Sequence, residues 1–415
     1  MRSIKFFYKV SGGITIQNSR SLLMAVNYQE DLAEEGVGSG VESESEESQF
    51  QTGEPFDPAS ISLSSKIIAL DTVLRRIRNN TIKLAPDFQR NFVWDVKRKS
   101  LLIESMMLRI PLPMFYVSED KDGRWEVVDG LQRLTTIKDF ILGEDDDGKG
   151  FKLKGLEFWG GSFDGKDFYT IENKLKAARV INNIMEAELS FTIINPDTPE
   201  KVKRNIFKRI NTGGMRLSTQ EIRHALYQGE ASKLLKELVN NDTYLRVVGK
   251  NVKDDRMAGR ELALRFISFH LRRRTDFGGD MDEFLSDTMR HINKEYVVPL
   301  RAPYSRIALI ESFEKALVRS HSIFGEHVFR RSSGSGRKTP INKSLFEMWT
   351  VLFARLTSAT YENIFANKAS FLNSYYEILQ DDVFSDAIGK YGSESSGVRD
   401  RYSTIIKLLK EYQNA

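Results

Sequence analysis

The feature that most constrains the fold is a change of sequence pattern at Ser218. Before it, short runs rich in β-branched and aromatic residues alternate with amphipathic runs at helical spacing. After it, almost every segment has helical periodicity, and a loop is expected at 330–340. The pattern predicts an α+β domain followed by a mostly α-helical C-terminal domain.

Individual elements of the first domain follow from periodicity, turn residues and prolines. The sequence predicts helices at 64–80, 97–113, 131–144 and 198–214, and strands at 114–120, 124–130 and 187–196. Pro111 and Pro113 are expected to stop the second helix, and an Asp-Gly turn at 120–123 is expected to join the first two strands.

Charge is distributed unevenly along the chain. Residues 1–65 contain four basic and ten acidic residues, so the rest of the chain carries a net charge of about +10. The polar, Gly/Ser-rich stretch within them cannot bury enough apolar surface to fold alone. We expect an acidic, largely disordered leader at 1–61, followed by domains at 62–230 and 231–415. The leader is either simply solvated or a nucleic-acid mimic that occupies a basic groove until DNA displaces it.

Composition excludes several classes of function. The chain has no cysteine, which rules out disulfides, cysteine zinc sites and thiol nucleophiles, and its five histidines leave little for metal chemistry beyond carboxylates. No apolar run approaches the ~18 residues of a membrane span. With no apolar signal segment at the N-terminus, a cytoplasmic location is expected.

The most informative segment is the turn from Asp129 to Arg133, where a strand ends and a helix begins. Gly130 lets a ligand approach the main chain, and free N–H groups at a helix start favour an anion. Arg133 can bind phosphate oxygens in bidentate fashion, Asp129 can hold Mg²⁺ or orient a water, and Gln132 can position that water. The alternative is an ordinary β-turn in which Arg133 forms a surface salt bridge.

Two further polar clusters stand at element boundaries. Gln89 and Arg90 lie between aromatic residues that either stack on a base or fill a core. Arg209, Asn211 and Gly214 come where a helix ends in a Gly pair, which is either a simple cap or part of an anion site. Basic runs such as 272–274 fit a phosphate-tracking surface, although each is also typical of a solvated surface.

The segments PDFQRNFVW, KSLLIESMMLRIPLP, VVDGLQRLTTIKDF and IFKRINTGGMRLSTQEIRHAL occur in the order and approximate spacing of one family. Over roughly residues 62–230 the chain resembles the N-terminal domain of GmrSD-type modification-dependent restriction enzymes. That domain belongs to the ParB/sulfiredoxin-like fold group, and its signature is an Asp-Gly-Gln-Gln-Arg motif. The resemblance implies a nucleoside triphosphate hydrolase coupled to DNA recognition in defence against phage.

The signature maps onto Asp129, Gly130, Gln132 and Arg133, which the resemblance implies are the catalytic and phosphate-binding turn. Its first Gln is Leu131 in this chain, so the resemblance also allows a domain that binds nucleotide and hydrolyses it slowly. The family's other recurring residues map onto a second set, expected to bind nucleotide or phosphate: Gln89, Arg90, Arg209, Asn211 and Gly214.

Many family members carry a C-terminal HNH nuclease, whose chemistry needs clustered His and Asn residues. The C-terminal half of this chain has only scattered histidines, so we expect no HNH nuclease here and a companion nuclease subunit instead. DNA is the expected partner, and a homo-oligomer is an open alternative. Two rival functions remain: a nucleotide-gated DNA-binding module without catalysis, and a metal-dependent DNA nickase that uses Asp129.

Overall fold

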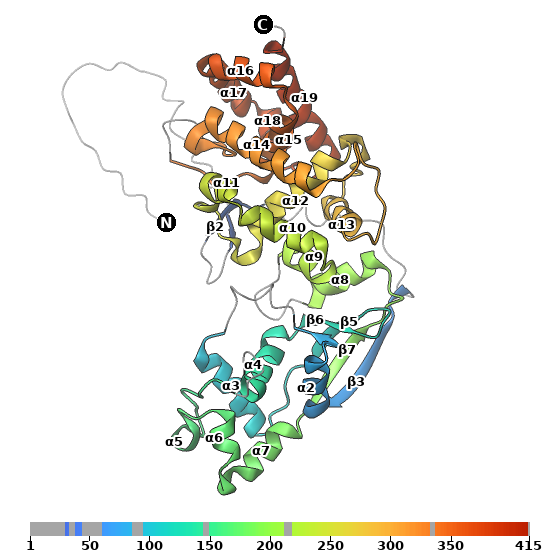
Figure 1. The fold of residues 1–415 in the computed structure, drawn as a ribbon, viewed down its shortest axis with the longest axis vertical. Helices are drawn as coiled ribbons and strands as arrows, with labels where there is room; N and C mark the ends of the chain where they lie inside the picture. The colour runs from blue at the N-terminus through green and yellow to red at the C-terminus, as the bar shows by residue number, and fades with distance from the viewer. Residues whose placement is uncertain are drawn as a thin grey trace, which may run out of the picture.

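The computed structural model describes residues 30–32, 38–43, 60–84, 94–143, 149–210, 218–332 and 337–413. A small sheet with its helices forms one end of the molecule and a helical domain forms the other (Figure 1). Helices α8 and α9 lie between the two parts (Figure 1). The expected α+β architecture with a helical C-terminal region is therefore confirmed.

The sheet is mixed and has the strand order β3-β7-β5-β6-β4. β3 pairs antiparallel with β7, β7 parallel with β5, β5 antiparallel with β6, and β6 parallel with β4. The five strands are β3 (Leu63–Ala69), β4 (Ile82–Lys83), β5 (Phe115–Glu119), β6 (Trp125–Asp129) and β7 (Glu188–Ile194).

The helix predicted at 64–80 is wrong in its first half. Residues Leu63–Ala69 form strand β3, and helix α2 occupies only Leu70–Arg78. All seven residues of β3 pair with β7, a segment more than a hundred residues away in sequence. The apolar spacing that favoured a helix included Ile67, whose side chain is 68% exposed on the strand. Tertiary pairing therefore overrides the local periodicity here.

The other predicted elements of this domain are present, but the helix expected to stop at Pro111 and Pro113 ends earlier, at Met107. β5 and β6 form the expected hairpin, and the Asp120 carboxylate accepts hydrogen bonds from the turn N–H groups of Asp122 and Arg124. The predicted helices correspond to α3 (Val96–Met107), α4 (Leu131–Leu142) and α8 (Glu200–Ile210), and the strand predicted at 187–196 corresponds to β7. The Gly pair expected after α8 lies outside the described residues.

Alternate side chains of the three central strands, β5, β6 and β7, enter two different apolar clusters, one on each face of the sheet. Trp125 and Val127 of β6 pack on the side of α2, α3, α4, α6 (Phe168–Glu172) and α7 (Ala178–Met185). Val128 faces the other way and packs against α8 and α9 (Thr219–Leu226). Because β6 is buried on both faces, its position is fixed relative to α4 on one side and to α8 and α9 on the other.

The C-terminal region is built from packed helices, as predicted. They are α10 (Glu230–Val239), α11 (Asp242–Tyr244), α12 (Ala258–Leu271), α13 (Met281–Ile292), α14 (Arg306–Phe324), α15 (Lys343–Arg355), α16 (Ser358–Ala366), α17 (Lys368–Gln380), α18 (Asp382–Ile388) and α19 (Ser395–Glu411). Their core contains a fully buried ion pair in which the Arg401 guanidinium contacts both Glu347 oxygens at 2.9 Å. None of the helices in the described ranges is long and apolar enough to cross a membrane.

Part of the acidic leader belongs to the helical domain. Strand β2 (Gly38–Glu42), which pairs with β1 (Glu30–Leu32), exchanges backbone hydrogen bonds with Ile341 at 2.8 Å. Val41 is fully buried in the helical core, and the Glu42 carboxylate accepts hydrogen bonds from Arg331 and Asn342. The leader therefore contributes an ordered strand in a region expected to be largely disordered.

Helices α8 and α9 attach the sheet to the helical domain through ion pairs. Asp282, in the first turn of α13, contacts Arg223 of α9 at 2.9 Å and Arg204 of α8 at 3.8 Å. Beside it, Glu283 contacts Lys201 at 2.9 Å on a more exposed surface. The expected domain boundary at 230 therefore lies just after α8 and α9, the two helices that contact both the sheet and the helical domain.

Candidate functional site

The turn from Asp129 to Arg133 links β6 to α4 through one glycine. Gly130 has φ +91°, a backbone conformation that favours glycine, and it stands directly before the first residue of α4. A Cβ at this position would overlap the ring of Phe115 on β5. The close approach of two strands and the entry into α4 therefore both require glycine at position 130.

The guanidinium of Arg133 is held by several partners at this turn. Its Nη2 donates to Asp129 Oδ2 at 2.9 Å and to the Met114 carbonyl at 3.2 Å, and its Nη1 donates to the Pro113 carbonyl. It also lies 4.5 Å from the centroid of the Phe115 ring. Burial lowers the pKa of Arg133, and the Asp129 carboxylate opposes that shift.

These contacts give Arg133 a structural role in the state seen here. Its guanidinium joins the first turn of α4 to the segment before β5, and only 12% of its side chain is exposed. Asp129 is 39% exposed, so its carboxylate remains accessible to solvent and ligand. The first N–H groups of α4 have no partner within the helix, as in any helix, and such groups can bind an anion.

Leu131 differs from its neighbours in this turn because it is a core residue. Its side chain is 9% exposed and belongs to the apolar cluster that contains Phe115 and Leu134. Gln132, next along the helix, is half-buried. An apolar residue at position 131 therefore packs inward, while the polar residues around it surround the end of β6.

A metal at this turn would rest on one carboxylate. Among the described residues there is no group of three His, Asp or Glu side chains arranged to hold a metal ion. Mg²⁺ in nucleotide sites is commonly held by one or two carboxylates together with the phosphates of the ligand. Asp129 fits that arrangement and does not fit a metal site made by protein side chains alone.

The flanks of the other two clusters lie at different positions along β6. β4 runs parallel to β6, and its last residue, Lys83, pairs with Glu126 near the start of β6. Helix α8 begins beside the start of β6, and its later residue Phe207 packs with Val128 near the strand's end. Arg209 is exposed in the last turn of α8. Four predicted site residues lie outside the described residues: Gln89, Arg90, Asn211 and Gly214.

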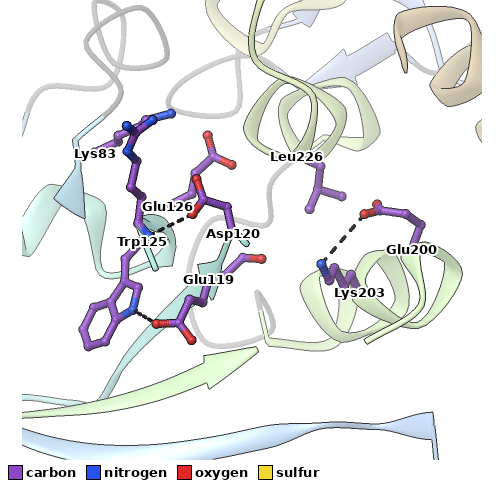
Figure 2. A pocket seen from close by; sticks show the side chains of 10 residues that line it. Lys83, Glu119, Asp120, Trp125, Glu126, Glu200, Lys203 and Leu226 are labelled. Atoms are coloured by element: carbon purple, nitrogen blue, oxygen red, sulfur yellow. Dashed lines mark hydrogen bonds and ion pairs between the residues drawn. The ribbon is translucent and has the colours of Figure 1, made fainter. Parts of the chain in front are cut away.

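A cavity of about 160 Å³ lies at the other end of β6, between the sheet and helices α8 and α9. Figure 2 shows Glu126 and Asp120 on one side of it and the ion-paired Glu200 and Lys203 on the other. Because the cavity lies at the start of β6 and the Asp129 turn at its end, the two are separate sites.

Glu126 is the unusual titratable group of this cavity. Burial raises the pKa of its carboxyl to about 7, helped by Asp120, Glu295 and Glu200 and opposed by Lys83. The sequence analysis missed this residue, because a single Glu between Trp125 and Val127 is what any half-buried strand shows. Only the helix that covers this face of the sheet reveals it.

Comparison with known proteins agrees with the family resemblance seen in the sequence. Residues 70–228 match the family of the GmrSD restriction endonuclease N-terminal domain. The matched segment contains the Asp129 turn and all the other predicted site residues, and it ends just after α9. A search of curated proteins found no match to the chain.

Proposed function

Since residues 70–228 form a GmrSD restriction endonuclease N-terminal domain, we propose that they bind and hydrolyse a nucleoside triphosphate at the Asp129 turn. The energy of this reaction would be coupled to recognition of DNA in restriction-type defence against phage. The observation that carries the proposal is the position of the signature residues at one edge of the sheet, at the open start of α4. The small mixed sheet flanked by helices supports a ParB/sulfiredoxin-like fold for this domain.

Each residue of the turn has a role in this proposal. The N–H groups after Gly130 and the guanidinium of Arg133 bind phosphate oxygens, and Gln132 positions the attacking water. Phosphate competes with Asp129 for Arg133, so nucleotide binding frees the Asp129 carboxylate. That carboxylate would hold Mg²⁺, which supplies charge neutralisation on the phosphates. Catalysis is then mainly positioning and charge neutralisation.

The second set of residues is proposed to complete the nucleotide site. Arg209 is exposed at the end of α8, on the side of the sheet edge where β6 ends. We propose phosphate contact for Arg90 and Arg209 and ribose or base contact for Asn211, with Gln89 and the Gly214 amide beside them. The burial of Leu131 favours slow turnover, because no amide stands at that position.

DNA cleavage is proposed to come from outside this chain. The scattered histidines of the C-terminal half lack the pattern of an HNH nuclease, so we propose a companion nuclease subunit as the source. A homo-oligomer is a further proposal. A cytoplasmic location would suit this role.

The test is phosphate release from ATP, GTP, CTP and UTP by the purified protein with Mg²⁺, with and without DNA. Asp129→Ala should abolish release. Asp122→Ala is the matched control, because Asp122 is an exposed acidic residue in the turn at the other end of β6. Equal release by both variants and wild type would refute the assignment of the Asp129 turn.

Two other outcomes would select the rival functions. Nucleotide binding without phosphate release would identify a nucleotide-gated DNA-binding module, the function that the buried Leu131 favours. Nicking of supercoiled plasmid that disappears in Asp129→Ala would identify a metal-dependent nickase.

A further inference from the structure

Three arginines from separate segments lie near the C-terminal end of α12 in the helical domain; we call them the α12 cation cluster. They are Arg274, Arg301 and Arg355. The Arg355 guanidinium donates to the carbonyls of Phe269 and His270 at 2.6 and 3.0 Å, and the backbone N–H of Arg301 donates to the Leu271 carbonyl at 2.8 Å. Arg274 lies three residues after the end of α12, and its guanidinium is 4.6 Å from the centroid of the Tyr402 ring.

The cluster lacks acidic partners. In the part of the chain that the structure describes, none of the three guanidinium groups forms an ion pair with a carboxylate. Asp276, in the turn after α12, is occupied by the backbone N–H of Arg273. Burial lowers the pKa of Arg355 to about 10, with further lowering by Arg301 and Arg274.

The lowered pKa of His270 reflects the same excess of positive charge. Burial lowers its pKa to about 4, and Arg355, Arg301 and Lys315 lower it further. Its Nδ1 is buried without a hydrogen-bond partner among the described residues. The imidazole is therefore neutral at pH 7, and the positive charge of this surface resides in the arginines and Lys315.

Hydrogen bonds at the end of α12 account for the position of Arg355, but no such contact accounts for the side chains of Arg274 and Arg301. Arg355 satisfies carbonyls at the end of α12, where a helix favours a cation. Arg274 is half-buried and contacts the Tyr402 ring, Arg301 is exposed, and neither has a carboxylate partner in the described ranges to offset its repulsion of Arg355. The neighbouring Arg272, by contrast, is buried against Phe284 and donates to its carbonyl at 3.0 Å. Of the basic run at 272–274, Arg274 is thus the residue that joins the cluster.

We propose that the α12 cation cluster binds the phosphate backbone of DNA, with Arg274 and Arg301 as the contacting residues. Guanidinium groups match phosphate oxygens in geometry, and an anion relieves the repulsion among the three. The cluster belongs to the helical domain, whereas the Asp129 turn belongs to the sheet domain (Figure 1). The inference rests on the proposed function for its choice of DNA, and it assigns the helical domain a direct part in holding the substrate.

The experiment is fluorescence anisotropy with a labelled DNA duplex over a range of salt concentrations, using the full chain. The test variant is R274Q/R301Q, and Arg355 is kept because it caps α12. The matched control is R399Q/K407Q, which removes two positive charges from exposed positions on α19. Circular dichroism and thermal unfolding confirm that both variants fold.

We expect R274Q/R301Q to bind DNA about tenfold more weakly than the control. The negative slope of log K against log salt should become less steep, by about 2. Equal affinities and slopes in the two variants would overturn the inference. Binding of an acidic leader peptide, but not of DNA, that depends on the two arginines would also overturn it.

Phosphate release measured on the same samples separates the two proposals. Wild-type protein that releases phosphate yet binds no DNA would overturn the cluster and leave the nucleotide site standing. DNA binding that depends on the cluster, without phosphate release, would overturn the proposed hydrolysis and leave the cluster standing.

Discussion

The ion pairs between the sheet and the helical domain lead to a quantitative prediction about Asp282. Its carboxylate is shared by Arg223 and Arg204, whose side chains are only 3% and 8% exposed. Burial opposes the charge of Arg204, but the carboxylates around it, led by Asp282, raise its pKa above the usual value. Asp282→Ala therefore leaves two buried guanidinium groups with weakened partners.

Removing one member of a buried ion pair typically costs about 3–5 kcal/mol. Arg223 keeps a hydrogen bond to Gln220, and Arg204 keeps one to the backbone carbonyl of residue 282 at 3.3 Å. We therefore expect Asp282→Ala to lower the free energy of unfolding by about 3 kcal/mol, toward the lower end of that range.

Urea unfolding at pH 7, followed by circular dichroism, measures the change. Glu283→Ala is the matched control, because Glu283 is the next residue in the same first turn of α13 and loses the same helix-dipole interaction. Its pair with Lys201 is 36% and 64% exposed, so this variant should cost only about 0–1 kcal/mol. Equal losses in the two variants would show that burial does not set the strength of this junction.

Two other changes test the ends of β6. Gly130→Ala should lower the free energy of unfolding by about 2–4 kcal/mol, because it combines positive φ with overlap of the Phe115 ring. Gly123→Ala, at φ +75° with open space around it, should cost only about 1–2 kcal/mol in the same urea titration. Glu126 has a raised pKa in the folded state, so its contribution to stability is complete below pH ~4.5 and is lost as pH rises through about 7. Glu126→Gln should remove this loss, and a variant whose stability follows the wild-type pH profile would contradict it.

Local signals explain what the sequence could predict. The hairpin at 120–123 and the start of α4 follow from turn residues and helical spacing that a short window contains. The proximity of Asp129 and Arg133 follows from their four-residue separation on either side of a helix start. The helical C-terminal region follows in the same way from its periodicity.

Distant pairing explains what the sequence could not predict. β3 was assigned to a helix because its partner β7 lies far along the chain, and no short window contains both. The carbonyls of Pro113 and Met114 that hold Arg133 have no sequence signal either. The raised pKa of Glu126 depends on the helix that covers it, so it too requires the tertiary structure.

The strand that carries Val41 has a consequence for the order of biosynthesis. Its hydrogen-bond partner Ile341 is made 300 residues later, so this strand cannot dock until the ribosome has synthesised the helices between them. Contacts at such separation form slowly, because a long loop must close first. The helical domain thus reaches its final packing only after two segments 300 residues apart have both been synthesised, and a fragment that begins after residue 230 would lack one of the domain's strands.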